Sequence, residues 1–237
     1  MVLMKSKENV PKDAVLLTEE DAIKYAWDFV DGWKTPSDVW ALRFGPFILG
    51  GINAISGLII NNHFRNKLKL GPYGFLSSAI PISLMPGILT PLFHRYIVST
   101  DMLLMKAETC PLCYEIRSTV LQLGLGVVYP MLLAPTTAMM LSHRYATARI
   151  PELYDGPRVI VKFVSKLARP LQGTVATLAG LQVVSSALIT YFEMRNILSI
   201  RREVMELERK LENEESLRYI GDAPMNFTSS LVFNSAL

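Results

Sequence analysis

Two cysteines offer the clearest redox chemistry in this chain of 237 residues. Cys110 and Cys113 form a C-x-x-C pair, which can close a disulfide, exchange thiols or supply two ligands of a zinc site. Small four-helix membrane oxidoreductases place such a pair beside a quinone, but this chain has no second cysteine pair to pass electrons onward. We expect a local disulfide or unpaired thiols without a catalytic role. A thiol–quinone oxidoreductase remains the alternative.

The other residue types that catalysis requires are scattered. Each of the three histidines, His63, His94 and His143, lies at the end of a long apolar segment. If these segments cross a membrane, only His94 is predicted on the same side of it as the cysteines. Zinc takes four protein ligands, or three and a water, so we expect no bound metal. The sequence has no phosphate-binding loop, nucleophile elbow or metalloprotease motif. We therefore expect neither an enzyme nor a cofactor.

A basic stripe follows Gly156-Pro157, where proline suits the first turn of a helix. Arg158, Lys162, Lys166 and Arg169 recur at steps of four, four and three, so they share one helix face. A basic amphipathic helix beside a membrane span lies in the interface and attracts anionic lipids, cardiolipin among them. The alternative is an ordinary positively charged connection.

Long apolar segments must position these residues. Half of the chain is hydrophobic, 19% is charged and the mean hydropathy is +0.28. Four windows contain no charged residue: Phe44–Phe64, Leu70–His94, Ser118–Ser142 and Pro170–Phe192. Each is long enough to cross a bilayer, because about 20 apolar residues suffice for a helix. We predict an all-α membrane protein: a bundle of four transmembrane helices, with short amphipathic helices in the tails and the third connection.

The windows divide the chain into three predicted parts. Residues 1–43 form an N-terminal arm with a short amphipathic helix that Thr18 can cap, and the tryptophans of this arm are expected at the membrane interface. Residues 44–192 form the four-span membrane domain, with spans at about 44–64, 70–94, 118–142 and 170–192. Residues 193–237 form a charged helical extension and an uncharged C-terminal tail.

The prolines of the windows bear on the shape of the spans, and their lack of carboxylates bears on whether they could transport ions. Four prolines interrupt the second window, so this span is predicted to be kinked or broken, and Pro130 and Pro135 predict a milder bend in the third. No Asp or Glu lies inside a window, so an ion-coupled transporter would lack its usual intramembrane carboxylate. A small-solute transporter that uses the broken second span is a further alternative.

Small residues spaced four apart predict close contacts between helices, and a buried Asn can donate a hydrogen bond across such a contact. The residues expected to pack helices are Gly50, Gly51, Asn53, Ala54, Gly57, Ala176 and Gly180.

The distribution of positive charge predicts an orientation. Residues 65–69 and 143–169 carry about twice the density of Lys and Arg found in the tails and residues 95–117. The positive-inside rule places these two connections on the cytoplasmic or matrix side, and both termini on the opposite side. The N-terminus lacks the pattern of a cleavable targeting signal. The net charge is only +3 and basic residues are not interleaved with aromatic ones, so we expect no nucleic-acid partner.

Several short motifs resemble the transmembrane protein 126 family. Gly51-Ile52-Asn53-Ala54 with Gly57-Leu58-Ile59 resembles its first span, and Glu108-Thr109-Cys110, Tyr129-Pro130 and His143-Arg144-Tyr145 follow in order. The similarity extends from about Gly50 to Tyr191. The interval before Arg117 and the charged tail after Phe192 look longer than the familiar pattern.

Members of that family are multi-pass proteins of the mitochondrial inner membrane that are associated with assembly of respiratory complex I. The resemblance therefore implies a non-catalytic scaffold whose partners are membrane-arm subunits of complex I and other assembly factors. With this location, both termini are expected in the intermembrane space.

Overall fold

A computed structural model describes residues 18–104, 111–148 and 156–221 of the chain. All regular structure in these residues is helical, and four helical stretches are long and apolar enough to cross a membrane: 40–67, 75–103, 111–145 and 158–211. The predicted all-α membrane fold is therefore confirmed. The chain divides into two units, residues 5–197 and residues 1–4 with 198–237, which are described separately.

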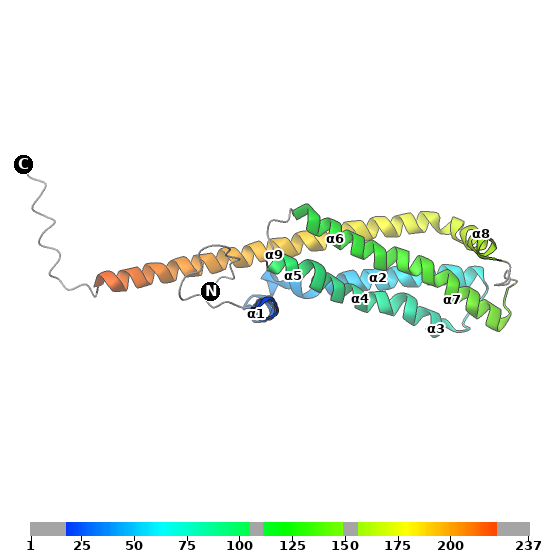
Figure 1. Cartoon of the computed structure of the whole chain (residues 1–237), viewed down its shortest axis with the longest axis horizontal. Coiled ribbons are helices and arrows are strands. Elements are labelled where there is room, and N and C mark those ends of the chain that lie inside the picture. The colour runs from blue at the N-terminus through cyan, green and yellow to red at the C-terminus, as the bar shows by residue number, and fades with distance from the viewer. Residues whose placement is uncertain (1–17, 105–110, 149–155, 222–237) are drawn as a thin grey trace, which may run out of the picture. The chain divides into compact units, whose positions relative to one another are not determined.

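The bundle of residues 18–197 contains the four spans (Figure 1). The first is α2 (Trp40–Lys67). The second combines α3 (Phe75–Ala79), η2 (Ile80–Leu84), α4 (Met85–His94), η3 (Arg95–Ser99) and α5 (Thr100–Leu103). The third combines α6 (Pro111–Leu123), η4 (Gly124–Val128) and α7 (Tyr129–Tyr145). The fourth is α9 (Gln172–Gly221), of which residues 172–197 belong to the bundle. The remaining elements are α1 (Glu19–Asp31), η1 (Pro36–Asp38), α8 (Pro157–Ala168) and η6 (Arg169–Leu171).

Prolines widen the second and third spans without breaking them. The segments η2, η3 and η4 are π-helical turns, and η2 and η4 lie directly before the pairs Met85-Pro86 and Tyr129-Pro130. In η2 the Met85 amide donates to the Ile80 carbonyl, and Pro86 has no amide hydrogen, so the Pro81 carbonyl loses both nearby backbone donors. The hydroxyl of Tyr129 donates to this carbonyl at 2.9 Å and restores the missing bond.

Glycines of α2 make room for other carbonyls whose usual i+4 donor is replaced by proline. The carbonyls of Ile82 and Gly87 lie four residues before Pro86 and Pro91, which cannot donate to them. A Cβ atom on Gly57 would lie 2.5 Å from the Ile82 oxygen, and one on Gly50 would lie 2.4 Å from the Gly87 oxygen. The first and second spans therefore approach backbone to backbone at these two points.

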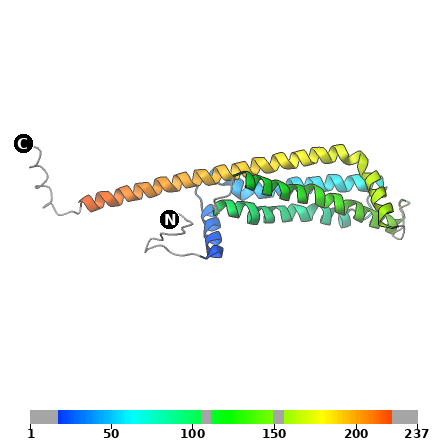
Figure 2. The same cartoon turned by 45° about the horizontal axis from the view of Figure 1, so that its top comes forward.

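The two ends of the bundle carry the short helices (Figures 1 and 2). At one end the side chain of Thr18 caps α1, and α1 buries Trp27 against the second span. The Trp27 Nε1 atom donates to Thr100 Oγ1 at 3.1 Å, and the Arg95 guanidinium lies 3.8 Å from the Trp27 ring centroid. Trp27 is therefore a docking residue inside the protein rather than an anchor exposed to lipid.

At the other end α8 covers the apolar core near the ends of α2 and α7. The core residues there are Ile60, Phe64, Leu68, Leu70, Ile82, Ala134, Ala138, Leu171 and Leu178. Phe163 and Leu167 of α8 pack against this cluster, and His63 Nε2 lies 3.4 Å from the Leu167 carbonyl oxygen. The described residues of both basic connections predicted to share one side of the membrane thus lie at one end of the bundle.

The described part of the second unit, residues 198–221, is helical. Leu198, Met205, Leu207 and Leu211 are exposed large apolar side chains in it. The predicted C-terminal tail after residue 221 lies outside the described residues.

Candidate functional site

A buried polar layer, the glutamine layer, joins all four spans at the centre of the bundle. Gln122 of α6 donates to Gln182 Oε1 of α9 at 2.6 Å, and Gln182 donates to Ser56 Oγ of α2 at 2.8 Å. Asn53 of α2 donates to Thr90 Oγ1 of α4 at 2.7 Å. Each of these five side chains is at most 1% exposed.

A second layer, the acid–base layer, lies one helical turn away. Its members are His94, Ser99, Ser118, Ser186 and Glu193, all with no exposed surface. His94 Nε2 lies 3.1 Å from Glu193 Oε2, and Ser99 Oγ donates to Glu193 Oε1 at 3.2 Å. On the other side of the ring, His94 Nδ1 lies 3.4 Å from Ser118 Oγ, which shares a hydrogen bond of 2.7 Å with Ser186 Oγ.

The spacing of the polar residues along the chain explains why the two layers stack. Thr90 and His94, Ser118 and Gln122, and Gln182 and Ser186 are each four residues apart, and a helix rises about 6 Å over four residues. Each of these three spans therefore contributes at least one polar side chain to each layer. α2 contributes only to the glutamine layer.

Gly126 gives the glutamine layer its space. A Cβ atom on Gly126 would lie 2.1 Å from Asn53 Oδ1 and 2.7 Å from Gln182 Nε2. A larger residue fits here only if these two amides move, and each is held by its own hydrogen bond to another helix. Asn53 Oδ1 itself has no hydrogen-bond partner among the described residues.

The acid–base layer has the order of a serine, histidine and carboxylate catalytic triad, but its side chains are buried in the interior of the bundle. A nucleophile must reach a substrate, whereas the side chains of Ser118, His94 and Glu193 are fully enclosed. Hydrogen bonds between spans select which helices pair and in which register, since apolar helix faces are equally compatible with lipid. We therefore interpret the two layers as the elements that hold this bundle in one arrangement.

Arg65 closes the turn after the first span in a similar way. Its guanidinium donates to the carbonyls of Gly71 and Tyr73 at 2.7 and 2.9 Å and to Ser78 Oγ at 2.9 Å, although the residue is only 1% exposed. Gly71 has a φ of 52°, in the left-handed region that favours glycine. The sequence predicts Arg65 in a positively charged connection between spans. In the structure it is buried, and its hydrogen bonds hold this connection in place.

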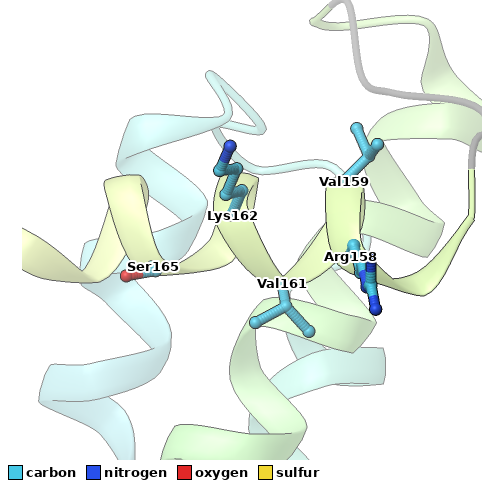
Figure 3. A pocket seen from close by; sticks show the side chains of 5 residues that line it. All are labelled: Arg158, Val159, Val161, Lys162 and Ser165. Carbon is cyan, nitrogen blue, oxygen red and sulfur yellow. The ribbon is translucent and has the colours of Figure 1, made fainter.

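The four predicted basic residues of the third connection lie on α8 and on η6 directly after it. Arg158, Lys162, Lys166 and Arg169 are all exposed. Arg158 and Lys162 line an open hollow of about 600 Å³ together with Val159, Val161 and Ser165 (Figure 3). All five lining residues come from α8, so this hollow has only one protein wall.

The residues expected to pack helices fall into two groups. Gly50, Asn53, Ala54 and Gly57 lie against the second or third span: a Cβ on Gly87 would lie 3.2 Å from the Ala54 Cβ, and the Ala54 carbonyl accepts from Ser83 at 2.6 Å. Gly51, Ala176 and Gly180 are exposed, and neither glycine has a neighbouring atom within 4 Å of where a Cβ would lie.

The C-x-x-C pair is described only in part. Cys113 is exposed in the first turn of α6, and Cys110 lies outside the described residues. The predicted disulfide stays a prediction. His94, the histidine considered beside the cysteines, makes its described contacts inside the acid–base layer.

Sequence reasoning missed Glu193 and the glutamine layer. The fourth predicted span ends at Phe192, because the next residue, Glu193, is charged. In the structure α9 continues past this point and buries Glu193 completely. A signal was present, since Gln182, Ser186, Thr190 and Glu193 recur at steps of four, four and three within an apolar span. Such a polar stripe in a membrane helix indicates a face turned toward other helices.

Comparisons with known proteins show which sequences this chain is similar to. The family model described as Transmembrane protein 126 matches residues 34–203, which includes all four spans through the bundle. The chain is 37% identical to the fruit fly (Drosophila melanogaster) Transmembrane protein 126 over 215 residues, 90% of this chain and 96% of the fly protein. It is 29% identical to the rat (Rattus norvegicus) Transmembrane protein 126A over 116 residues, 49% of this chain and 58% of the rat protein. No solved structure matches the chain significantly. On the extent of these matches, the chain belongs to the transmembrane protein 126 family.

Proposed function

We propose that this protein is a non-catalytic scaffold of the mitochondrial inner membrane that assists assembly of the membrane arm of respiratory complex I. The observation that carries the proposal is the family match over residues 34–203, together with the complex I association that the resemblance to this family implies. The partners in this proposal are incomplete membrane-arm subunits and other assembly factors.

The arrangement of the small residues supports a scaffold. The polar layers and the Gly50 and Gly57 contacts hold the four spans together from inside, so the outward faces need not serve the fold. Ala176 and Gly180 lie four apart on the exposed face of α9. Small residues let a further membrane helix approach closely, and close packing is what drives helix association in lipid.

Deletion of the protein tests the proposal directly. We expect less assembled complex I and accumulation of a membrane-arm intermediate on native electrophoresis of mitochondria. A normal amount of active complex I without such an intermediate would contradict the role. Localisation is checked on the same samples, because a scaffold of the inner membrane must resist carbonate extraction and co-fractionate with inner-membrane markers.

Surface variants separate docking from folding. Gly180→Leu adds a side chain where no protein atom lies within 4 Å, so the bundle should keep its thermal stability while co-purification of membrane-arm subunits falls. Thr136→Leu is the matched control, because Thr136 is exposed on α7 and its hydroxyl bonds only carbonyls of its own helix. Equal co-purification of partners with both variants would remove the α9 face from the proposal.

A proton-coupled transporter is a second candidate, and one observation favours it. Glu193 supplies the buried carboxylate that this alternative lacked, and it is paired with His94. Purified protein in liposomes with a pH-sensitive dye inside should show no proton flux if the scaffold proposal holds. Flux that Glu193→Gln abolishes would favour transport instead.

A further inference from the structure

The exposed face of α8 combines positive charge with apolar side chains at one end of the bundle. The stripe of Arg158, Lys162 and Lys166 is flanked by Val159 on one side and Val161 on the other, and these valines are 42% and 67% exposed. Residues 157–168 contain no Asp or Glu. Among the described residues, no carboxylate forms an ion pair with these three cations.

The opposite face of α8 fixes the level at which this stripe lies. Phe163 and Leu167 pack against the core cluster, and His63, near the end of the first span, contacts the Leu167 carbonyl at 3.4 Å. After Ala168 only η6 separates α8 from α9, which begins the fourth span at Gln172. The helix lies across the bundle where the spans begin and end, which is the level of lipid headgroups (Figure 2).

We propose that the basic stripe of α8, Arg158, Lys162 and Lys166 with the flanking valines, binds the phosphate of anionic phospholipid headgroups. The hollow beside Arg158 and Lys162 is open on every side except α8 (Figure 3). At a membrane surface the missing wall is the lipid itself: the cations face the phosphates, and Val159 and Val161 meet the first carbons of the acyl chains. Successive cations on the stripe are about 6 Å apart along the helix, so a lipid with two phosphates can engage two of them.

Lipid retention by the full-length protein tests the proposal. The protein is placed in nanodiscs of phosphatidylcholine containing phosphatidylglycerol or, at matched charge, cardiolipin, and the lipids retained after mild extraction are counted by native mass spectrometry. We expect Lys162→Gln with Lys166→Gln to lower retention of anionic lipid about 25-fold, since each basic residue at an anionic surface contributes roughly a fivefold change in affinity. Lys162→Arg with Lys166→Arg should retain the lipid.

Two controls make the result decisive. Arg202→Gln with Lys210→Gln removes two exposed cations of the second unit and should leave retention unchanged. Thermal unfolding of each variant in detergent checks that the bundle is intact, which is expected because the substituted side chains are exposed. Equal retention by the wild type and the Lys162/Lys166 glutamine variant, or an equal loss in the Arg202/Lys210 variant, would overturn the proposal.

A depth measurement and a phosphate measurement distinguish a lipid surface from a site for free anions. A spin label on Ser165→Cys, in a Cys110→Ser, Cys113→Ser background, should report headgroup depth in anionic vesicles and in phosphatidylcholine alone, because Phe163 and Leu167 hold α8 at this level. Water exposure of the label in both vesicles would contradict lipid binding. Saturable binding of inorganic phosphate to the lipid-free protein in detergent would also contradict it, because it would show an anion site independent of the membrane.

Discussion

His94 and Glu193, which are 99 residues apart in the chain, meet in the bundle with 3.1 Å between Nε2 and Oε2. Neither side chain has any exposed surface. The pair ties the second span to the fourth, and Ser118 extends the link to the third through the other ring nitrogen. Removal of either partner would leave a polar group enclosed without its main hydrogen bond, which is among the most costly changes a core can suffer.

Replacement of the histidine should therefore destabilise the bundle strongly. We expect His94→Leu to lower the free energy of unfolding by about 3 kcal/mol, because Glu193 would keep only its hydrogen bond from Ser99. Thermal unfolding of the purified protein in detergent measures this change.

The double variant His94→Leu, Glu193→Leu should recover part of the lost stability, since it removes the unpaired carboxyl group as well. His63→Leu is the matched control, because His63 is only half-buried and its one hydrogen-bond contact among the described residues is 3.4 Å long. An equal loss of stability in His63→Leu and His94→Leu would show that the acid–base layer contributes no more to stability than a partly buried histidine does.

Adjacent glycines of the first span should respond oppositely to alanine. Gly50→Ala places a methyl group 2.4 Å from the Gly87 carbonyl oxygen and should cost about 1–3 kcal/mol, because two backbones must separate. Gly51→Ala has open space and should be neutral or stabilise the helix by up to about 1 kcal/mol. The thermal unfolding of the two variants, compared in the same detergent, measures this difference in stability. The close contact would be disproved if Gly50→Ala were as stable as Gly51→Ala.

The glutamine layer makes a second glycine comparison possible, within one π-helical turn. Gly126→Ala would bring a methyl group within 2.1 Å of Asn53 Oδ1, so the hydrogen bonds of Asn53 and Gln182 should break together. Gly124→Ala meets no atom within 4 Å and serves as the control. We expect a lower midpoint of thermal unfolding and faster digestion by protease only for Gly126→Ala. Matching behaviour of the two variants would argue against a tightly packed layer.

The N-terminal helix should depend on one indole. Trp27→Phe removes the hydrogen bond to Thr100 and weakens the contact with Arg95, so α1 should detach more often, at a cost of about 1 kcal/mol for the hydrogen bond. Limited proteolysis within residues 19–31 measures detachment while the spans remain protected by the detergent micelle. Trp33→Phe is the control, since Trp33 contacts Phe29 of its own segment. Similar cleavage rates for both variants would mean that Trp27 does not hold α1.

The cysteines should be accessible from the intermembrane space and dispensable for the scaffold. In intact mitoplasts a membrane-impermeant maleimide should label Cys113 after mild reduction, whereas residues 143–169 should resist added protease. Cys110→Ser with Cys113→Ser should restore complex I in cells that lack the protein. Normal insertion with complete loss of complex I in this double variant would favour the oxidoreductase alternative. Cleavage of residues 143–169 in mitoplasts, with both termini protected, would invert the orientation.

The sequence by itself determined the class of fold and the number of spans. Uncharged windows of more than 20 residues leave few choices, because a chain in lipid must satisfy its backbone internally and does so most simply as helices. The capped helix after Thr18 and the basic helix after Gly156 were also predictable, since their capping residues and charge spacing are local features of the sequence. In each of these cases the physical cause lies within one continuous segment of the chain.

The tertiary structure decided which polar residues meet and what the prolines do. Glu193 looked like the first residue outside a span, and only the neighbouring His94 and Ser99 make its burial tolerable. Gly50 and Gly51 are identical in type and adjacent, yet one faces the Gly87 carbonyl and the other faces outward. Pro86 and Pro91 were expected to kink or break a helix, but glycines of α2 make room for the carbonyls whose usual donors these prolines remove. These outcomes depend on contacts between residues distant in the chain, and the pattern of a single segment does not specify its neighbours.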